Sequence, residues 1–233
     1  MVKMRVRLAA AAMKTLPSPI NSTGANSYSA PFVFSFEFRT CLIFMADPYR
    51  IIGWAWVAVV MIWLVAGTAS KRMVRRQSTV SRYLQLCLGV VAGLLIWGRG
   101  PWQVMFSAQI VPQSPDTGNL GLALTLAGRA FALSARFVLG KNWSATVTIK
   151  HDHELVRSGP YAIVRHPIYS GFLLALLGTS IARGNIGAFV GVAITALALR
   201  LKSLNEESFM LEQFGSQYTA YKQDVKALIP FVW

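Results

Sequence analysis

The feature that most constrains this chain is an unbroken apolar run from Ile51 to Ser70. Its twenty residues include no charged side chain. About 20 consecutive apolar residues let an α-helix cross the hydrocarbon core of a bilayer. A water-soluble domain rarely contains such a run, because a helix that is apolar on every side has no face to turn toward water. The run therefore predicts a membrane-spanning helix.

Four further apolar runs follow along the chain. They cover Tyr83–Gly98, Leu120–Leu139, Ile168–Ala182 and Ile186–Leu199. The last two are separated only by Arg183, Gly184 and Asn185, which predicts a tight helical hairpin. Because backbone polar groups in lipid must be satisfied within the chain, apolar spans of this length form helices. We therefore expect an all-α, polytopic membrane bundle with about five transmembrane helices.

The segment after Leu199 has a different pattern. Leu201, Leu204, Ser208 and Leu211 recur at spacings of three and four residues, which gives a narrow apolar stripe on one helical face. Gly215 is expected to break this helix. The pattern predicts a cytoplasmic amphipathic C-terminal helix after the last span.

The charge of the chain is strongly positive, with a formal net charge of +14, although only 14% of its residues are charged. Many of the basic residues lie at the ends of apolar runs, where headgroups and membrane potential favour them. A nucleic-acid-binding protein carries them on a water-exposed face instead. We expect contact with membrane lipids and no nucleic acid. The two cysteines and three histidines form no recognisable ligand pattern, so no metal site is expected.

Loop charges predict the orientation. The loops 71–82 and 141–167 hold several basic residues each, whereas the loops 99–119 and 183–185 hold one each. Cytoplasmic loops are enriched in lysine and arginine. The C-terminus is therefore predicted to be cytoplasmic and the segment before Ile51 to lie outside. The compact size and short loops favour a multi-pass protein of a bacterial inner membrane.

Residues 1–44 do not fit this orientation, because they carry five basic residues and one acid. We expect them to be a disordered N-terminal extension, either wrongly included upstream of a start at Met45 or a targeting segment. Residues 45–127 then hold the first two transmembrane helices and their loops. Residues 128–233 form the predicted catalytic region.

The segment richest in chemically useful side chains is 153–172, which reads HELVRSGPYAIVRHPIYSGF. Pro167 favours the first position of a helix, and the residue before a proline is kept out of the helical region. Arg165 and His166 therefore precede a helix N-terminus, where the helix dipole attracts a carboxylate. Singly, Arg165, His166 and Tyr169 would be ordinary interfacial anchors. Together they indicate a binding site.

A second polar group follows the last span. Arg200 lies at the predicted membrane edge, and Glu206 and Glu207 adjoin the amphipathic stripe. Two acids on a solvated helix are common, so this segment alone does not favour function over structure. The sequence also leaves open which of the two glutamates acts.

The two segments together resemble the isoprenylcysteine carboxyl methyltransferase family, which shares its pattern with membrane phospholipid N-methyltransferases. The resemblance covers roughly residues 128–230. The motifs that carry it are His153-x-Leu155-Val156, Gly159-Pro160-Tyr161, Arg165-His166-Pro167-x-Tyr169-x-Gly171 and Glu206-Glu207, with Phe214-Gly215, Tyr218, Tyr221 and Ile229-Pro230 after them.

The resemblance implies an S-adenosylmethionine-dependent methyltransferase, most simply an O-methyltransferase, with a cofactor site that faces the cytoplasm. The catalytic residues it implies are Arg200, which would contact the substrate, and Glu206, which would close the site. The lipophilic substrate, a carboxylate, would be reached from the bilayer. The expected cofactor-binding residues are His153, Leu155, Val156, Tyr161, Arg165, His166, Pro167, Tyr169 and Glu207.

Three other functions remain open at this point. The chain is also compatible with a phospholipid or amine N-methyltransferase, and with a non-catalytic membrane protein. A membrane reductase of the sterol-reductase type has a similar C-terminal half. The chain lacks a Gly-x-Gly-x-x-Gly nucleotide motif, but membrane reductases need not use one.

Overall fold

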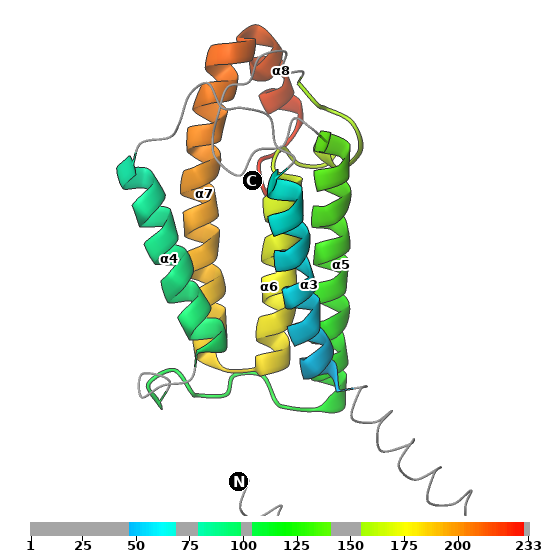
Figure 1. Ribbon diagram of the computed structural model, residues 1–233, viewed down its shortest axis with the longest axis vertical. Coiled ribbons are helices and arrows are strands. Elements are labelled where there is room, and N and C mark those ends of the chain that lie inside the picture. The colour runs from blue at the N-terminus through cyan, green and yellow to red at the C-terminus, as the bar shows by residue number, and fades with distance from the viewer. Residues whose placement is uncertain (1–46, 69–78, 99–103, 141–154, 231–233) are drawn as a thin grey trace, which may run out of the picture. The chain divides into compact units, whose positions relative to one another are not determined.

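The computed structural model describes residues 47–68, 79–98, 104–140 and 155–230. Its helices, shown in Figure 1, are α3 (Pro48–Thr68), α4 (Thr79–Trp97), α5 (Pro115–Leu139), the 3-10 turn η4 (Gly159–Ala162), α6 (Pro167–Arg183), α7 (Ile186–Phe214) and α8 (Ser216–Asp224). The helices α3 to α7 coincide with the five apolar runs, which confirms the predicted helical membrane bundle. The extension 1–44 and His153 lie outside the described residues.

The predicted number of five spans is too high when helices are judged by their length and composition. Among the described residues, three helices are long and apolar enough to cross a membrane, at Pro48–Val65, Pro115–Leu139 and Ile186–Phe214. The apolar part of α4, Tyr83–Trp97, is shorter. α6 has 17 residues, which is about 26 Å at 1.5 Å per residue, against a hydrocarbon core of about 30 Å. Counting apolar runs did not take this length limit into account.

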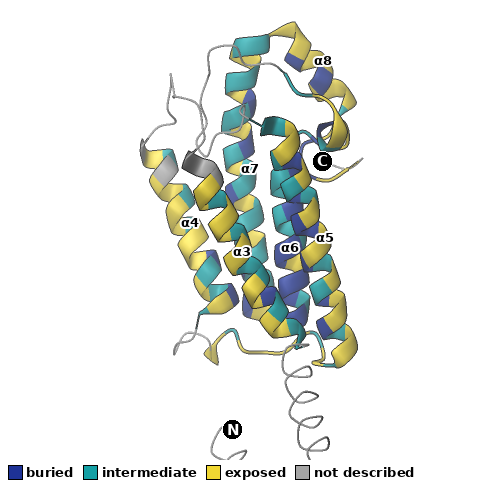
Figure 2. Cartoon of the chain, turned by 45° about the vertical axis from the view of Figure 1, so that its right-hand side comes forward, coloured by how far each residue is buried: buried dark blue, intermediate teal, exposed yellow. Residues whose placement is uncertain are grey.

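The core of the bundle is the pair α5 and α6, and α4 packs along α7 (Figure 1). Figure 2 shows buried residues on the facing sides of the central helices and exposed residues on the outer faces of α3 and α4. The α5–α6 contact is close because glycines face backbone. A Cβ added at Gly128 would lie 2.5 Å from the carbonyl oxygen of Gly171 and 2.5 Å from the amide nitrogen of Ala175. The two helices therefore meet without intervening side chains.

Gly128→Ala should destabilise the folded protein by about 1–3 kcal/mol, because the added methyl group must push the two backbones apart. Gly89→Ala in α4 is the matched control, since nothing lies within 4 Å of a Cβ at that position. Alanine is also the better helix former, so the control should be neutral or slightly stabilising. Thermal unfolding in detergent measures both. Equal stability of the two variants would show that the close contact contributes nothing.

The predicted hairpin between α6 and α7 is confirmed. Gly184 ends α6 with a φ of 71°, a left-handed conformation that glycine adopts without strain. Its carbonyl oxygen accepts hydrogen bonds from the amides of Ile110 and Val111 at 2.8 and 3.1 Å. The Asn185 side chain then caps α7 by accepting from the Ala188 amide at 2.9 Å. These contacts fix where α7 begins.

The amphipathic segment is not a separate helix. α7 continues without a break from Ile186 to Phe214, so the apolar span and the amphipathic stretch form one rod of 29 residues. Gly215, with a φ of 52°, ends it as predicted, and α8 follows directly. The rigid rod carries Arg200, Glu206 and Glu207 beyond the end of the apolar part and beside the start of α6.

Candidate active site

The N-terminus of α6 is held in place by the C-terminal end of the chain. The backbone amides of Arg165 and His166 donate to the carbonyls of Lys226 and Ala227 at 2.8 and 3.0 Å. The Ser170 hydroxyl donates to the Leu228 carbonyl at 2.5 Å. His166 is the N-cap residue and Pro167 the first residue of the helix, as the sequence predicted. The tail therefore fixes the backbone from which the Arg165 and His166 side chains project.

Glu207 is the centre of a buried ion-pair cluster. Its Oε1 accepts from Arg165 Nη2 at 2.7 Å and from Arg165 Nε at 3.1 Å. His166 Nε2 lies 3.3 Å from the same oxygen, and Lys222 Nζ lies 3.0 Å from Oε2. The Glu207 residue is only 2% exposed. Because three cations share one buried carboxylate, the cluster joins the α6 start, α7 and α8.

Glu206 has a different environment, although it is the next residue. Its Oε1 accepts a hydrogen bond from the Tyr169 hydroxyl at 2.5 Å, and its Oε2 lies 3.4 Å from His166 Nδ1. The Lys202 ammonium lies 5.3 Å from the centre of the Tyr169 ring. The Glu206 side chain remains 20% exposed, against 3% for Glu207. Of the two glutamates, Glu206 therefore has the more exposed side chain.

His166 connects the two carboxylates. Its two ring nitrogens lie beside different glutamates, and the ring stacks on Tyr169 with 5.5 Å between ring centres and 5° between ring planes. Burial opposes its protonation, but hydrogen bonds to Glu206 and Glu207 and their negative charges prevail and raise the pKa of His166. The imidazolium form therefore suits this position, with both N–H groups donating.

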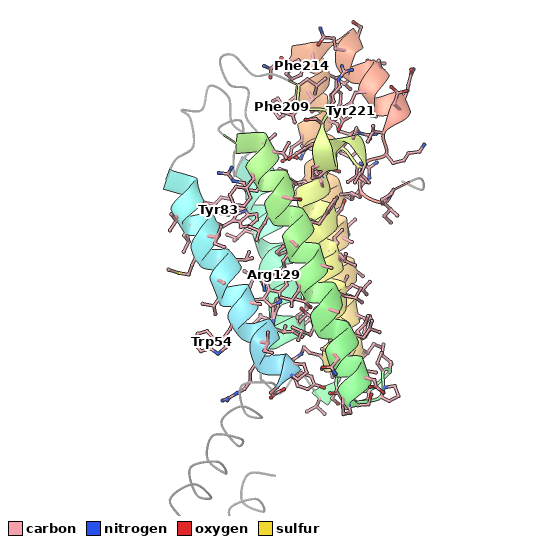
Figure 3. The ribbon with its side chains drawn as sticks, turned by 90° about the vertical axis from the view of Figure 1, so that its right-hand side faces the viewer. Trp54, Tyr83, Arg129, Phe209, Phe214 and Tyr221 are labelled. Carbon is pink, nitrogen blue, oxygen red and sulfur yellow. The ribbon has the colours of Figure 1, made fainter. Side chains whose placement is uncertain are left out.

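Three tyrosines, Tyr161, Tyr218 and Tyr221, lie near the cluster on η4 and α8. The Tyr221 hydroxyl on α8 donates to the Tyr161 carbonyl at 2.5 Å, and the Tyr218 and Tyr221 rings meet edge to face at 5.9 Å. Burial raises the pKa of Tyr221 to about 12 and raises the pKa of Tyr161 and of Tyr218 further. These side chains are therefore neutral, and they pack η4 against α8 (Figure 3 labels Tyr221).

The structure brings together five of the predicted site residues: Arg165, His166, Tyr169, Glu206 and Glu207. Pro167 and Tyr161 are buried next to them, and Leu155 and Val156 are half-buried ahead of η4. Arg200 lies on α7 six residues before Glu206, so the two point about 120° apart around the helix. Its Nη1 is 3.4 Å from Ser203 Oγ.

Two contributors were not predicted as site residues. Lys222 reaches the cluster from α8, and Lys202 lies over the Tyr169 ring. Lys202 is four residues before Glu206, a spacing that favours contact on a helix and was the available signal. No local spacing indicates Lys222. It lies on α8, and only the turn at Gly215 brings α8 back toward Glu207.

The site lies within a segment that matches a known family. Residues 121–213 match the model of the isoprenylcysteine carboxyl methyltransferase (ICMT) family. The matched residues, called the ICMT segment below, run from α5 through η4 and α6 to the end of α7. They include the cluster except for its α8 residues.

Curated relatives agree with the family match. The chain is 32% identical over 117 residues to protein-S-isoprenylcysteine O-methyltransferase B of Arabidopsis thaliana, over 49% of this chain and 59% of that protein. It is 34% identical to the Homo sapiens protein-S-isoprenylcysteine O-methyltransferase, over 48% of this chain and 40% of the relative. This chain therefore spans about half the length of these curated relatives.

A solved structure is also similar in sequence. It is that of the eukaryotic intramembrane Ras methyltransferase ICMT, at 26% identity, and the match covers 68% of this chain and 55% of that one with a TM-score of 0.43.

Proposed function

We propose that this chain is an S-adenosylmethionine-dependent methyltransferase that methylates the carboxylate of a lipophilic acceptor. The observation that carries the proposal is the partly exposed side chain of Glu206, whose carboxylate contacts Tyr169 and His166 beside the start of α6 within the ICMT segment. A protein-S-isoprenylcysteine O-methyltransferase activity in relatives supports an O-methyltransferase. The acceptor of this chain is proposed only as a lipophilic carboxylate.

The side chains present fit such a cofactor. When bound, S-adenosylmethionine supplies an electrophilic methyl group on a sulfonium cation. Glu206 offers an accessible carboxylate for a cation or a ribose hydroxyl, and the Tyr161 and Tyr169 rings offer apolar faces near it. We propose that Lys202 binds the cofactor's carboxylate, because both N–H groups of His166 face the glutamates and the amides of Tyr169 and Ser170 already donate to the His166 carbonyl. His153, Leu155, Val156 and Pro167 are proposed to complete the site.

The residues of the Glu207 cluster have a supporting role in this proposal. Arg165 donates to Glu207 and to the carbonyls of Val225 and Lys222, so its donors are already used. We propose that Arg165 and Glu207 orient His166, and that His166 orients Glu206. Methyl transfer to a carboxylate is a direct displacement and needs no general base. The protein therefore contributes alignment and exclusion of water.

We also propose the cellular setting. The basic loops 71–82 and 141–167 support a cytoplasmic site and C-terminus, with the segment before Ile51 outside, in a bacterial inner membrane. The exposed outer faces of α3 and α4 suit contact with lipid (Figure 2). The acceptor would then approach laterally from the bilayer.

Glu206→Gln and Tyr169→Phe should each weaken S-adenosylhomocysteine binding by a factor of about ten or more, because hydrogen bonds to a charged group are worth about 1.5–3 kcal/mol. Glu212→Gln is the control, since it is exposed on the same helix. Isothermal titration on detergent-purified protein measures the affinities, and thermal unfolding shows that the variants fold. Unchanged affinity in both site variants would remove Glu206 from the cofactor site. No binding by the parent protein would reject the methyltransferase proposal.

A further inference from the structure

The described part of the bundle contains one buried cation that the cluster does not use. Arg129, on α5, is only 6% exposed. Figure 3 shows it midway along the helices, away from the end that carries Phe214 and Tyr221. Gly128 beside it packs against Gly171 and Ala175, so Arg129 lies on the order of 10 Å along α6 from Pro167. It is therefore separate from the candidate active site.

The hydrogen bonds of Arg129 are incomplete. Its Nη2 donates to the carbonyl of Ala55 on α3, and the guanidinium carbon lies 4.8 Å from the centre of the Trp56 ring. Among the described residues, its Nε and Nη1 have no hydrogen-bond partner although both atoms are buried. A buried donor without a partner is costly, and a buried charge without a counter-charge more so. The observed contacts therefore leave part of the guanidinium unsatisfied.

Among the described residues, no acidic side chain forms an ion pair with Arg129. Between residues 51 and 150 the only acid is Asp116, thirteen residues before Arg129 or about 20 Å along α5. Residues 167–205 contain none. Glu206 and Glu207 are engaged by Tyr169, His166, Arg165 and Lys222. An intramembrane arginine with this environment calls for an anion from outside the chain.

We propose that Arg129 forms a binding site for the oxyanion head of an amphiphile that reaches it from the bilayer. Nε and Nη1 lie on different edges of the guanidinium, and each can donate a charge-assisted hydrogen bond to a carboxylate or phosphate oxygen. Trp56 covers the guanidinium and is half-buried, with its indole N–H donating to Thr179 Oγ1 at 3.0 Å. The oxyanion displaces this ring to reach Nε or Nη1, and the acyl chain lies along the apolar surface of α3.

The first test compares oleate with oleyl alcohol, which have the same chain and differ in the charged head. The wild-type protein should bind oleate roughly ten-fold or more tightly, because the acid alone can pair with the guanidinium. Arg129→Gln should remove this preference. Arg136→Gln is the matched control on the same helix, since Arg136 Nη1 already donates to Gly140 at 2.9 Å, and it should keep the preference. Equal binding of acid and alcohol by the wild type, as expected if water alone satisfies Nε and Nη1, would overturn the proposal.

The second test needs no change at Arg129 and so does not depend on that variant folding. Dibrominated stearate should quench the fluorescence of Trp56 more than its methyl ester does, with the Trp56 signal taken as the difference between wild type and Trp56→Phe. Equal quenching by acid and ester would contradict the site. The quenching experiment is then repeated with brominated phosphatidylglycerol and, as its control, brominated phosphatidylcholine. Stronger quenching by phosphatidylglycerol indicates an acidic phospholipid, whereas equal quenching by the two lipids indicates a single-chain acid. S-adenosylhomocysteine binding is measured in parallel. If the parent protein does not bind it, the proposed function is rejected, but the Arg129 site is not.

Discussion

Glu207→Gln should destabilise the folded protein by about 3–5 kcal/mol, which is the typical cost of breaking a buried ion pair by removing one partner. The substitution keeps the size of the side chain and removes its charge. Arg165, at 8% side-chain exposure, would then be buried without its carboxylate, and Lys222 would lose its partner. Thermal and denaturant unfolding in detergent measure the loss.

The three glutamates of α7 provide the controls for this prediction. Glu212→Gln, at an exposed position, should change stability by less than about 0.5 kcal/mol. Glu206→Gln should reduce cofactor affinity with a smaller effect on stability, because its side chain is one-fifth exposed. Equal stability losses for the 206 and 207 variants would show that the two carboxylates form one structural unit, and that the division of roles proposed for them is wrong.

The adjacent glutamates also show what the sequence could not predict. Neighbouring residues on a helix point 100° apart, so the two carboxylates necessarily have different surroundings. Which one is buried depends on the rotation of α7, and the narrow stripe of Leu201, Leu204 and Leu211 does not fix that rotation. The decision comes from Arg165, which the C-terminal segment holds in position through Lys226. The Arg165–Lys226 hydrogen bond joins residues about 60 positions apart in the sequence, so no local pattern predicts it.

The helices themselves were predictable because their signal is local. Apolar runs, the proline after His166 and the glycine at 184 each act on the chain within a few residues, and α3 to α7 lie where these signals place them. The number of spans was overestimated for a physical reason. An apolar run indicates burial in lipid or protein, and only the length of the finished helix decides whether it can cross, as the 17 residues of α6 illustrate.

Arg200→Ala should raise the activation free energy by about 2–5 kcal/mol, which lowers turnover by a factor of roughly thirty or more. Cofactor affinity should change little. The prediction rests on the proposed carboxylate acceptor. Arg200 is half-buried near the end of the apolar part of α7, and its Nη1 lies 3.4 Å from Ser203 Oγ. It points away from Glu206, so a substrate carboxylate at Arg200 would not compete with the carboxylate that faces the cofactor.

Three outcomes separate the possible roles of Arg200. Arg200→Lys should restore only part of the activity if the arginine orients a carboxylate through two parallel hydrogen bonds, because lysine lacks the planar fork. If the arginine only anchors α7 at the membrane surface, lysine should be fully active, since either side chain can extend to the headgroups. Arg50→Ala, at the exposed start of α3, is the arginine control and should retain full turnover. An amine acceptor would gain nothing from a positive charge, so full activity in both Arg200 variants would favour the N-methyltransferase over the carboxyl methyltransferase.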